Sequence, residues 1–246
     1  MTAEYSSPEF RARFTEQAKY AAERSDLIIA VSRFTATQVE ELLEVEPSRI
    51  RVIHHGTRAP RRDGTTVREN LVLTVGAVQK RKNIARLVKA FERLPEGWKL
   101  AIAGAAEGYG AAEELHAVET SPRRADIQVL GYVPDAALET LYARARIFAF
   151  PSLDEGFGMP VLDAMARGVP VVASRRSAVA EVAGESGEAA LLIDPEICEE
   201  LGAALTQLAS DDALREDLAR RGIERAAGFT WESAVEQTWK VYEELR

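Results

Sequence analysis

Apolar and polar positions follow one repeating order from about residue 68: a short apolar run, a loop, then apolar residues at helical spacing. Residues 71–75 form such a run, and Ile84, Leu87 and Phe91 follow it at helical spacing. Strands that alternate with helices indicate a parallel sheet with right-handed crossovers, and runs this apolar indicate burial on both faces. Residues 68–229 therefore predict an α/β fold, a Rossmann-like parallel sheet with helices on both faces. The other strands are predicted at residues 100–103, 127–130, 147–150, 169–173 and 190–193, and three helices after about residue 196.

The first 58 residues repeat this order on a smaller scale. Residues 27–31 predict a buried strand, and Ser32 is expected to cap the N-terminus of the helix that follows. Residues 49–54 predict a second strand. The stretch that follows offers nothing to bury, so it predicts a linker. We therefore expect four segments, at residues 1–58, 59–67, 68–229 and 230–246.

Composition narrows the function classes. The chain has 246 residues, 46% of them hydrophobic and 28% charged, which is enough to bury a full core. A formal net charge of -8 disfavours nonspecific nucleic-acid binding, so no nucleic-acid partner is expected. Cys198 is the single cysteine, which excludes an internal disulfide and a multi-cysteine metal site. Asp154 and Glu155 have no third ligand nearby in the sequence, so no metal is expected there either.

Two loops after predicted strands carry candidate chemistry, because parallel sheets bind ligands at the carboxyl ends of their strands. Residues 80–83 (Lys-Arg-Lys-Asn) follow the strand that is broken by Gly76, and we expect them to open a helix. Helix N-termini attract anions, and lysine and arginine add full charges, so this cluster predicts an anion site. A solvated basic turn is the alternative, and spacing alone leaves both open.

The second loop covers residues 152–160, where Gly156 and Gly158 allow the backbone to approach a ligand closely. Glu155 lies in this loop and Asp163 lies about two helical turns later, so we expect the two carboxylates on roughly one face. That spacing suits two hydroxyl-rich parts of one elongated ligand. A capped helix with surface carboxylates is the alternative, and spacing alone favours it.

These residues together resemble a known family. Residues 150–152, 155–166 and 168–172 closely resemble the central motif of glycosyltransferase family 4, and Val75 and Gly76 with residues 81–83 resemble its phosphate-binding segment. The resemblance covers nearly the whole chain. It implies a retaining, nucleotide-sugar-dependent enzyme and one half of a GT-B fold.

The family's roles carry over to the matching positions. Arg81 and Lys82 are implied to contact the donor diphosphate and offset charge on the leaving nucleotide, with Gly76 in the same segment. Glu155 is implied to hold the hydroxyls of the donor sugar, and we class it with Arg81 and Lys82 as catalytic. Asp163 stands where the family usually has a glutamate on the nucleotide ribose, which keeps the charge and shortens the reach. The other donor-binding positions are Gly156, the amides of Phe157, Gly158 and Met159 toward the sugar, those of Val161 and Leu162 toward a phosphate, and Tyr132 with Val133 beside the nucleobase.

The phosphate segment looks most like that of bacterial mannosyltransferases of polysaccharide assembly. This likeness implies transfer of mannose from GDP-mannose, with retention, to a glycan or lipid-linked acceptor. No cofactor besides the donor is implied, and we expect the enzyme in the cytoplasm or peripherally at the inner face of the membrane. Two alternatives are a nucleotide-sugar epimerase on the same fold and a non-catalytic nucleotide-sugar-binding subunit.

GT-B enzymes place their site between two Rossmann-like domains, and this sequence contains one complete domain of that kind. Residues 1–58 resemble the end of the acceptor-side domain, and residues 230–246 resemble the helix that crosses back toward it. We therefore expect a fragment with little turnover of its own. Its two unpaired strands predict a homodimer or strand exchange.

Overall fold

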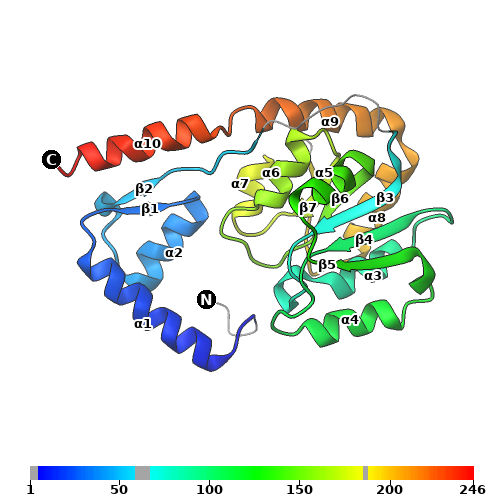
Figure 1. Ribbon diagram of the computed structural model, residues 1–246, viewed down its shortest axis with the longest axis horizontal. Helices are drawn as coiled ribbons and strands as arrows, with labels where there is room; N and C mark the ends of the chain where they lie inside the picture. Colours follow the sequence, from blue (N-terminus) through cyan, green and yellow to red (C-terminus); the bar gives the residue numbers. More distant parts are fainter. Residues whose placement is uncertain (1–4, 59–66, 185–187) are drawn as a thin grey trace.

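A six-stranded parallel sheet forms the centre of the molecule in the computed structural model, which describes residues 5–58, 67–184 and 188–246 (Figure 1). The strand order is β5-β4-β3-β6-β7-β8, so the chain builds outward in both directions from β3. Its strands are β3 (Glu69–Val75), β4 (Lys99–Ala103), β5 (Ile127–Gly131), β6 (Ala145–Phe150), β7 (Val171–Ser174) and β8 (Leu191–Ile193). The predicted linker lies, except for its last residue, outside the described residues.

Helices cover both faces of this sheet, which confirms the predicted fold class. Leu71 and Leu73 of β3 join one apolar core, and Val72 between them joins the other, as the period of a strand requires. The first core includes residues of α5 (Asp135–Arg144), α6 (Met159–Ala166) and α7 (Ala178–Ala183), and the second includes residues of α3 (Ile84–Phe91), α4 (Ala111–Glu119) and α8 (Cys198–Ser210). Helix α9 (Asp212–Ala226) contributes Ala226 to the first core and Leu218 to the second.

The N-terminal part is a thinner unit beside this domain (Figure 1). It contains α1 (Pro8–Arg24), β1 (Ile28–Ala30), α2 (Arg33–Leu43) and β2 (Ile50–Val52), and the two strands pair in parallel. The strand predicted at residues 27–31 forms as β1 but is only partly buried, because Ala30 is 1% exposed and Ile29 is 39% exposed. A sheet of two strands has a free edge on each strand, which limits how far its residues are buried.

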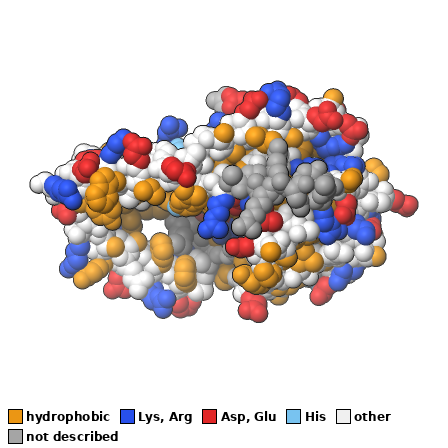
Figure 2. All heavy atoms as spheres, turned by 45° about the horizontal axis from the view of Figure 1, so that its top comes forward, with side chains coloured by type: hydrophobic (Ala, Val, Ile, Leu, Met, Phe, Trp, Pro, Cys, Tyr) orange, Lys and Arg blue, Asp and Glu red, His pale blue; other side chains and the backbone are white. Residues whose placement is uncertain are grey.

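Helix α10 (Trp231–Glu243) runs back from the large domain to this unit (Figure 1). Ala234 and Val241 pack with Ile53 in a small apolar cluster, and the Arg51 guanidinium pairs with the Glu244 carboxylate. An adjacent face of α10 exposes Trp231, Val235, Trp239 and Tyr242. Figure 2 shows hydrophobic side chains gathered over this part of the surface. No helix in the described part of the chain has the length and apolarity to cross a membrane.

Candidate functional site

The basic residues lie in a rigid turn at the carboxyl end of β3. Residues 80–82 form one 3-10 turn, Asn83 adopts the left-handed conformation with φ 59°, and α3 begins only at Ile84. The expectation that the basic cluster opens a helix is therefore corrected: the cluster precedes the helix. A bend at Asn83 separates the two, and it turns Lys82 into the protein interior, where 8% of the residue is exposed.

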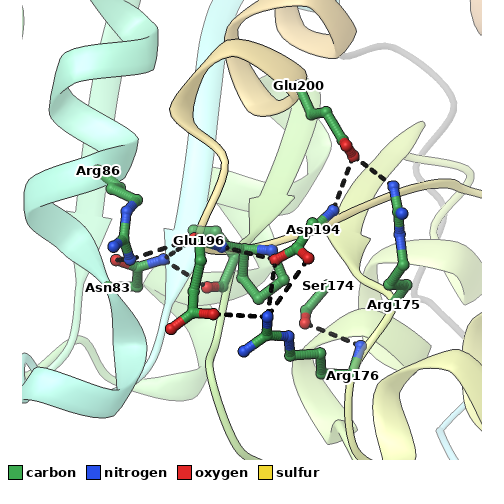
Figure 3. A network of polar contacts seen from close by, with 10 residues as sticks. Asn83, Arg86, Ser174, Arg175, Arg176, Asp194, Glu196 and Glu200 are labelled. Atoms are coloured by element: carbon green, nitrogen blue, oxygen red, sulfur yellow. Dashed lines mark hydrogen bonds and ion pairs between the residues drawn. The ribbon is translucent and has the colours of Figure 1, made fainter.

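Asn83 fixes this turn to the ends of two other strands, β6 and β8. Its Nδ2 donates to the carbonyl oxygens of Pro151 at 3.1 Å and Pro195 at 2.7 Å. Arg86 donates to Asn83 Oδ1 at 3.0 Å, so both ends of the buried amide are satisfied (Figure 3). The loop after β8 is itself held, because Arg176 pairs with Asp194 and Glu196 (Figure 3).

The three residues predicted to be catalytic are in contact, because Arg81 and Lys82 both approach one carboxylate oxygen of Glu155. Glu155 Oε1 lies 2.6 Å from Lys82 Nζ and 2.6 Å from a guanidinium nitrogen of Arg81. Ser152 Oγ donates to the same oxygen at 2.6 Å. The Lys82 stem passes directly over Gly76, where a Cβ would lie 2.9 Å from Lys82 Cε. The loops after β3 and β6 thus form one compact cluster with two cations and one carboxylate.

Burial and charge oppose each other in this cluster. Burial raises the pKa of the Glu155 carboxyl, but the two cations beside it outweigh burial and hold that pKa below its ordinary value. Burial lowers the pKa of the Lys82 ammonium, and attraction to Glu155 offsets only part of this effect. Arg81, Lys82 and Glu155 together carry one net positive charge, which favours an anionic ligand, while the Asp154 carboxylate beside Arg81 offsets part of it.

Backbone amides complete the cluster on one side. The amides of Phe157, Gly158 and Met159 donate no hydrogen bond to any described residue, and Gly158 has φ 105°. The amides of Val161 and Leu162 differ, because both donate to the Gly158 carbonyl, at 2.9 and 3.2 Å. A phosphate at those two amides would have to compete with this carbonyl. The predicted sugar-facing amides are thus available, and the predicted phosphate-facing ones are engaged.

Asp163 and Glu155 line different cavities, and their place on roughly one face stays a prediction. Helix α6 begins at Met159, so Glu155 belongs to the loop and not to the helix. Asp163 Oδ1 accepts a hydrogen bond from Thr57 Oγ1 at 2.8 Å and pairs with Arg167 at 3.2 Å. It lines a cavity of about 690 Å³ between α5, α6 and Trp231, which Glu155 does not line.

Tyr132 and Val133 follow β5 and differ from each other in exposure. Tyr132 is 79% exposed, while Val133 packs against the first core of the large domain. The Tyr132 side chain is therefore free to cover a ligand, and Val133 offers its backbone. Their predicted place beside a nucleobase stays a prediction.

A cavity of about 550 Å³ opens beside Glu155 between the large domain and the start of α1. Besides Arg81, Glu155 and Gly156, it is lined by residues that the motif comparison did not indicate: Tyr5, Ser6, Ser7, Phe10, Gln79, Tyr109 and Asp154. Tyr109 lies in the loop after β4, so it could have been found from the tendency of parallel sheets to bind ligands at the carboxyl ends of their strands. Residues of α1 could not be found in this way, because no motif joins them to the sheet.

The described residues contain no group of three or more histidine, cysteine, aspartate or glutamate side chains that could hold a metal ion.

Family models and curated relatives match this chain. The model of "Glycosyl transferases group 1" matches residues 57–225, and that of "Glycosyltransferase Family 4" matches residues 2–59. An O-antigen chain mannosyltransferase B from Escherichia coli is 33% identical over 97% of this chain and 66% of its own length. An MMP alpha-(1->4)-mannosyltransferase from Mycolicibacterium hassiacum is 32% identical over 94% of this chain and 57% of its own. The chain thus spans less than two thirds of these relatives.

Solved structures share the fold. A sucrose-phosphate synthase from Thermosynechococcus elongatus superposes with a TM-score of 0.83 and 25% identity, over 98% of this chain and 64% of that one. Anabaena HepE, solved in complex with UDP-glucose, superposes with a TM-score of 0.82 and 21% identity, over 97% of this chain and 69% of that one. These likenesses place the chain in the GT-B architecture.

Proposed function

Because the chain belongs to the group 1 glycosyl transferases, we propose that it takes part in transferring a hexose from a nucleoside-diphosphate sugar to an acceptor. The donor lies at the carboxyl ends of β3 and β6, with its diphosphate against Arg81 and Lys82 and its sugar against Glu155.

The observation that carries this proposal is the cluster around Glu155 Oε1. Two cations are fixed there before any ligand arrives, and among the described residues the amides of residues 157–159 find no acceptor. Breaking a glycosidic bond to a nucleotide places negative charge on the leaving diphosphate. Fixed cations and oriented amides in a site with little water stabilise that charge without reorganising. In this proposal the leaving group needs neither a metal nor another cofactor.

The donor sugar in this proposal is mannose, and GDP-mannose is the donor. Two curated relatives above 30% identity are named mannosyltransferases, and one acts on an O-antigen chain by its name. The acceptor is then a glycan or a lipid-linked glycan. Transfer proceeds with retention, by attack on the same face that the nucleotide leaves. A lipid-linked acceptor would place the enzyme in the cytoplasm, peripherally at the inner face of the membrane.

Self-association is a further part of the proposal. The free edges of β1 and β2 and the exposed face of α10 favour a homodimer or strand exchange.

Product analysis tests this function. The protein is incubated with GDP-mannose and an α-mannoside acceptor, and the products are resolved by NMR. A new α-mannoside that is absent with an Arg81→Ala, Lys82→Ala variant supports the proposal. A free sugar nucleotide with inverted sugar stereochemistry would instead establish an epimerase. Donor binding with no product in the presence of the acceptor would point to a binding subunit.

A further inference from the structure

The N-terminus of α2 rests directly on the donor loop. Ser32, which is fully buried, donates from Oγ to the Gly156 carbonyl at 2.7 Å, and Thr35 Oγ1 donates to the same oxygen at 2.9 Å. The Thr35 amide in turn donates to Ser32 Oγ at 2.9 Å, as an N-cap requires. The residue after the proposed sugar-binding glutamate is therefore held by a helix from the N-terminal unit.

Glu181 on α7 holds the same helix end from the other side. Its carboxylate accepts the amides of Arg33, at 2.9 and 3.0 Å, and Phe34, at 3.3 Å. His54 Nε2 lies 2.7 Å from Glu181 Oε1, which brings the end of β2 to the same point. A carboxylate at a helix N-terminus interacts favourably with the helix dipole. Burial raises the Glu181 pKa, but these contacts outweigh it and hold the pKa below its ordinary value.

The start of α7 also holds Glu155 itself. The Glu155 amide donates to Ser177 Oγ at 3.0 Å, and the Ala178 amide donates to the Glu155 carbonyl at 3.3 Å. The Glu155–Gly156 dipeptide thus lies between α7, which contacts the amide and carbonyl of Glu155, and α2, which contacts the Gly156 carbonyl. Whatever changes the distance between these two helices must move this peptide.

We propose that Glu181 is a positioning residue, which clamps α2 to α7 and thereby, with Ser32, fixes the Glu155–Gly156 peptide in the donor site. The effect on sugar binding rests on the proposed function, while the clamp itself does not. Glu181 touches no part of the proposed donor site directly, and it acts through the backbone of its neighbours. Its loss frees the loop without removing a ligand contact.

Hydrogen exchange tests the clamp without any ligand. Mass spectrometry with overlapping peptides follows the Glu155 amide of the loop, which donates to Ser177 Oγ, and, as an internal reference, β3 and β6. For Glu181→Ala and Ser32→Ala we expect loop exchange to rise by roughly tenfold, with the reference strands unchanged, as loss of a charge-assisted or buried hydrogen bond implies. Glu181→Gln keeps a hydrogen-bond acceptor, so its loop exchange should lie between that of the wild-type protein and that of Glu181→Ala. It replaces Glu181→Ala in the test if the alanine variant does not fold.

Glu236→Ala is the matched control, because Glu236 is also a helical glutamate in an ion pair but lies on the exposed surface of α10. It should leave loop exchange unchanged. Loop exchange that stays at the wild-type rate in both Ser32→Ala and Glu181→Gln overturns the clamp.

A second readout links the clamp to the sugar. Calorimetry compares the Kd for GDP-mannose with that for GDP in each variant. Glu181→Ala should weaken GDP-mannose several-fold more than GDP, because the loop that holds the sugar has been freed. An equal loss for both ligands overturns the positioning of the sugar. If the wild-type protein binds neither ligand, the proposed function fails, and the exchange experiment still decides the clamp.

Discussion

The large domain and the N-terminal unit use the same αβ order but achieve different burial. Ile147 in β6 has strands on both sides and helices on both faces, and it is fully buried, whereas Ile29 in β1 has one neighbouring strand and is 39% exposed. The large domain can therefore bury charged and polar side chains such as Lys82, Asn83 and Ser152 and keep them in fixed positions. The N-terminal unit supplies walls and contacts to the site rather than its charges. Its position depends on polar contacts, on α10, and on the packing of Val31 against the first core and of His54 and His55 against Phe157.

The largest expected effect is on stability. Ile147→Ala should lower the free energy of unfolding by about 2–5 kcal/mol, because it opens a cavity in a packed core. Ile29→Ala removes the same atoms from a half-exposed strand and should cost less than about 1 kcal/mol. Urea denaturation of the two variants compares them directly. Equal losses would show that the two sheets are equally well packed.

A smaller effect is expected from pH at the site. The Glu155 pKa is lower in the folded protein than its ordinary value of 4.5, so its ionised form stabilises the fold above that value. This contribution should be lost as pH falls through the lower folded pKa. Glu155→Gln should therefore reduce the slope of stability against pH on the acid side. Thermal melts from about pH 3 to about pH 6 measure this slope.

Glu236→Gln is the control for this pH profile, because Glu236 is fully exposed beside Lys240. Its effect on the slope should be slight. It should disappear in salt at about 1 M, because the Debye length is then only about 3 Å. If the slope changed equally in the two variants, burial of Glu155 would not be the cause.

The smallest effect concerns the exposed edges of the N-terminal unit. Light scattering at rising protein concentration should show weak self-association of the wild-type chain. Ile29→Lys places a charge on a free strand and should suppress it, whereas Arg24→Lys in α1 should not. A strictly monomeric wild-type protein at high concentration would contradict the prediction.

The sequence predicts the large domain well because most of its strands and helices have a recognisable local pattern of apolar residues. Apolar runs such as residues 71–75 indicate buried strands, and the spacing of Ile84, Leu87 and Phe91 indicates a helix. Helix α7 was not predicted, because its short Ala178–Ala183 segment is buried among other helices and has no polar face to set a period. The partial burial of β1 was not predicted, since an apolar run does not reveal how many strands will pair with it.

The candidate site divides in the same way. Arg81, Lys82 and Glu155 lie in motifs, and the structure places each of the two cations 2.6 Å from Glu155 Oε1. The contact of Ser32 with the loop and that of Glu181 with α2 could not be predicted, because each joins segments more than 100 residues apart in the chain. The role of Asp163 on the nucleotide ribose stays a prediction. Local chemistry is readable in a sequence, but the packing of distant elements is not.

Calorimetric titration with GDP, UDP, ADP and their sugar conjugates tests the central claim, that fixed cations at the ends of β3 and β6 bind a nucleotide sugar. We expect one nucleotide to bind the wild-type protein. The Arg81→Ala, Lys82→Ala variant should lose at least roughly 100-fold in affinity, because each charge-assisted hydrogen bond contributes about 1.5–3 kcal/mol. Arg220→Ala, Lys240→Ala makes the same charge change on the surface and should bind normally. No binding by the wild-type protein, or equal binding by the first variant, would contradict the account.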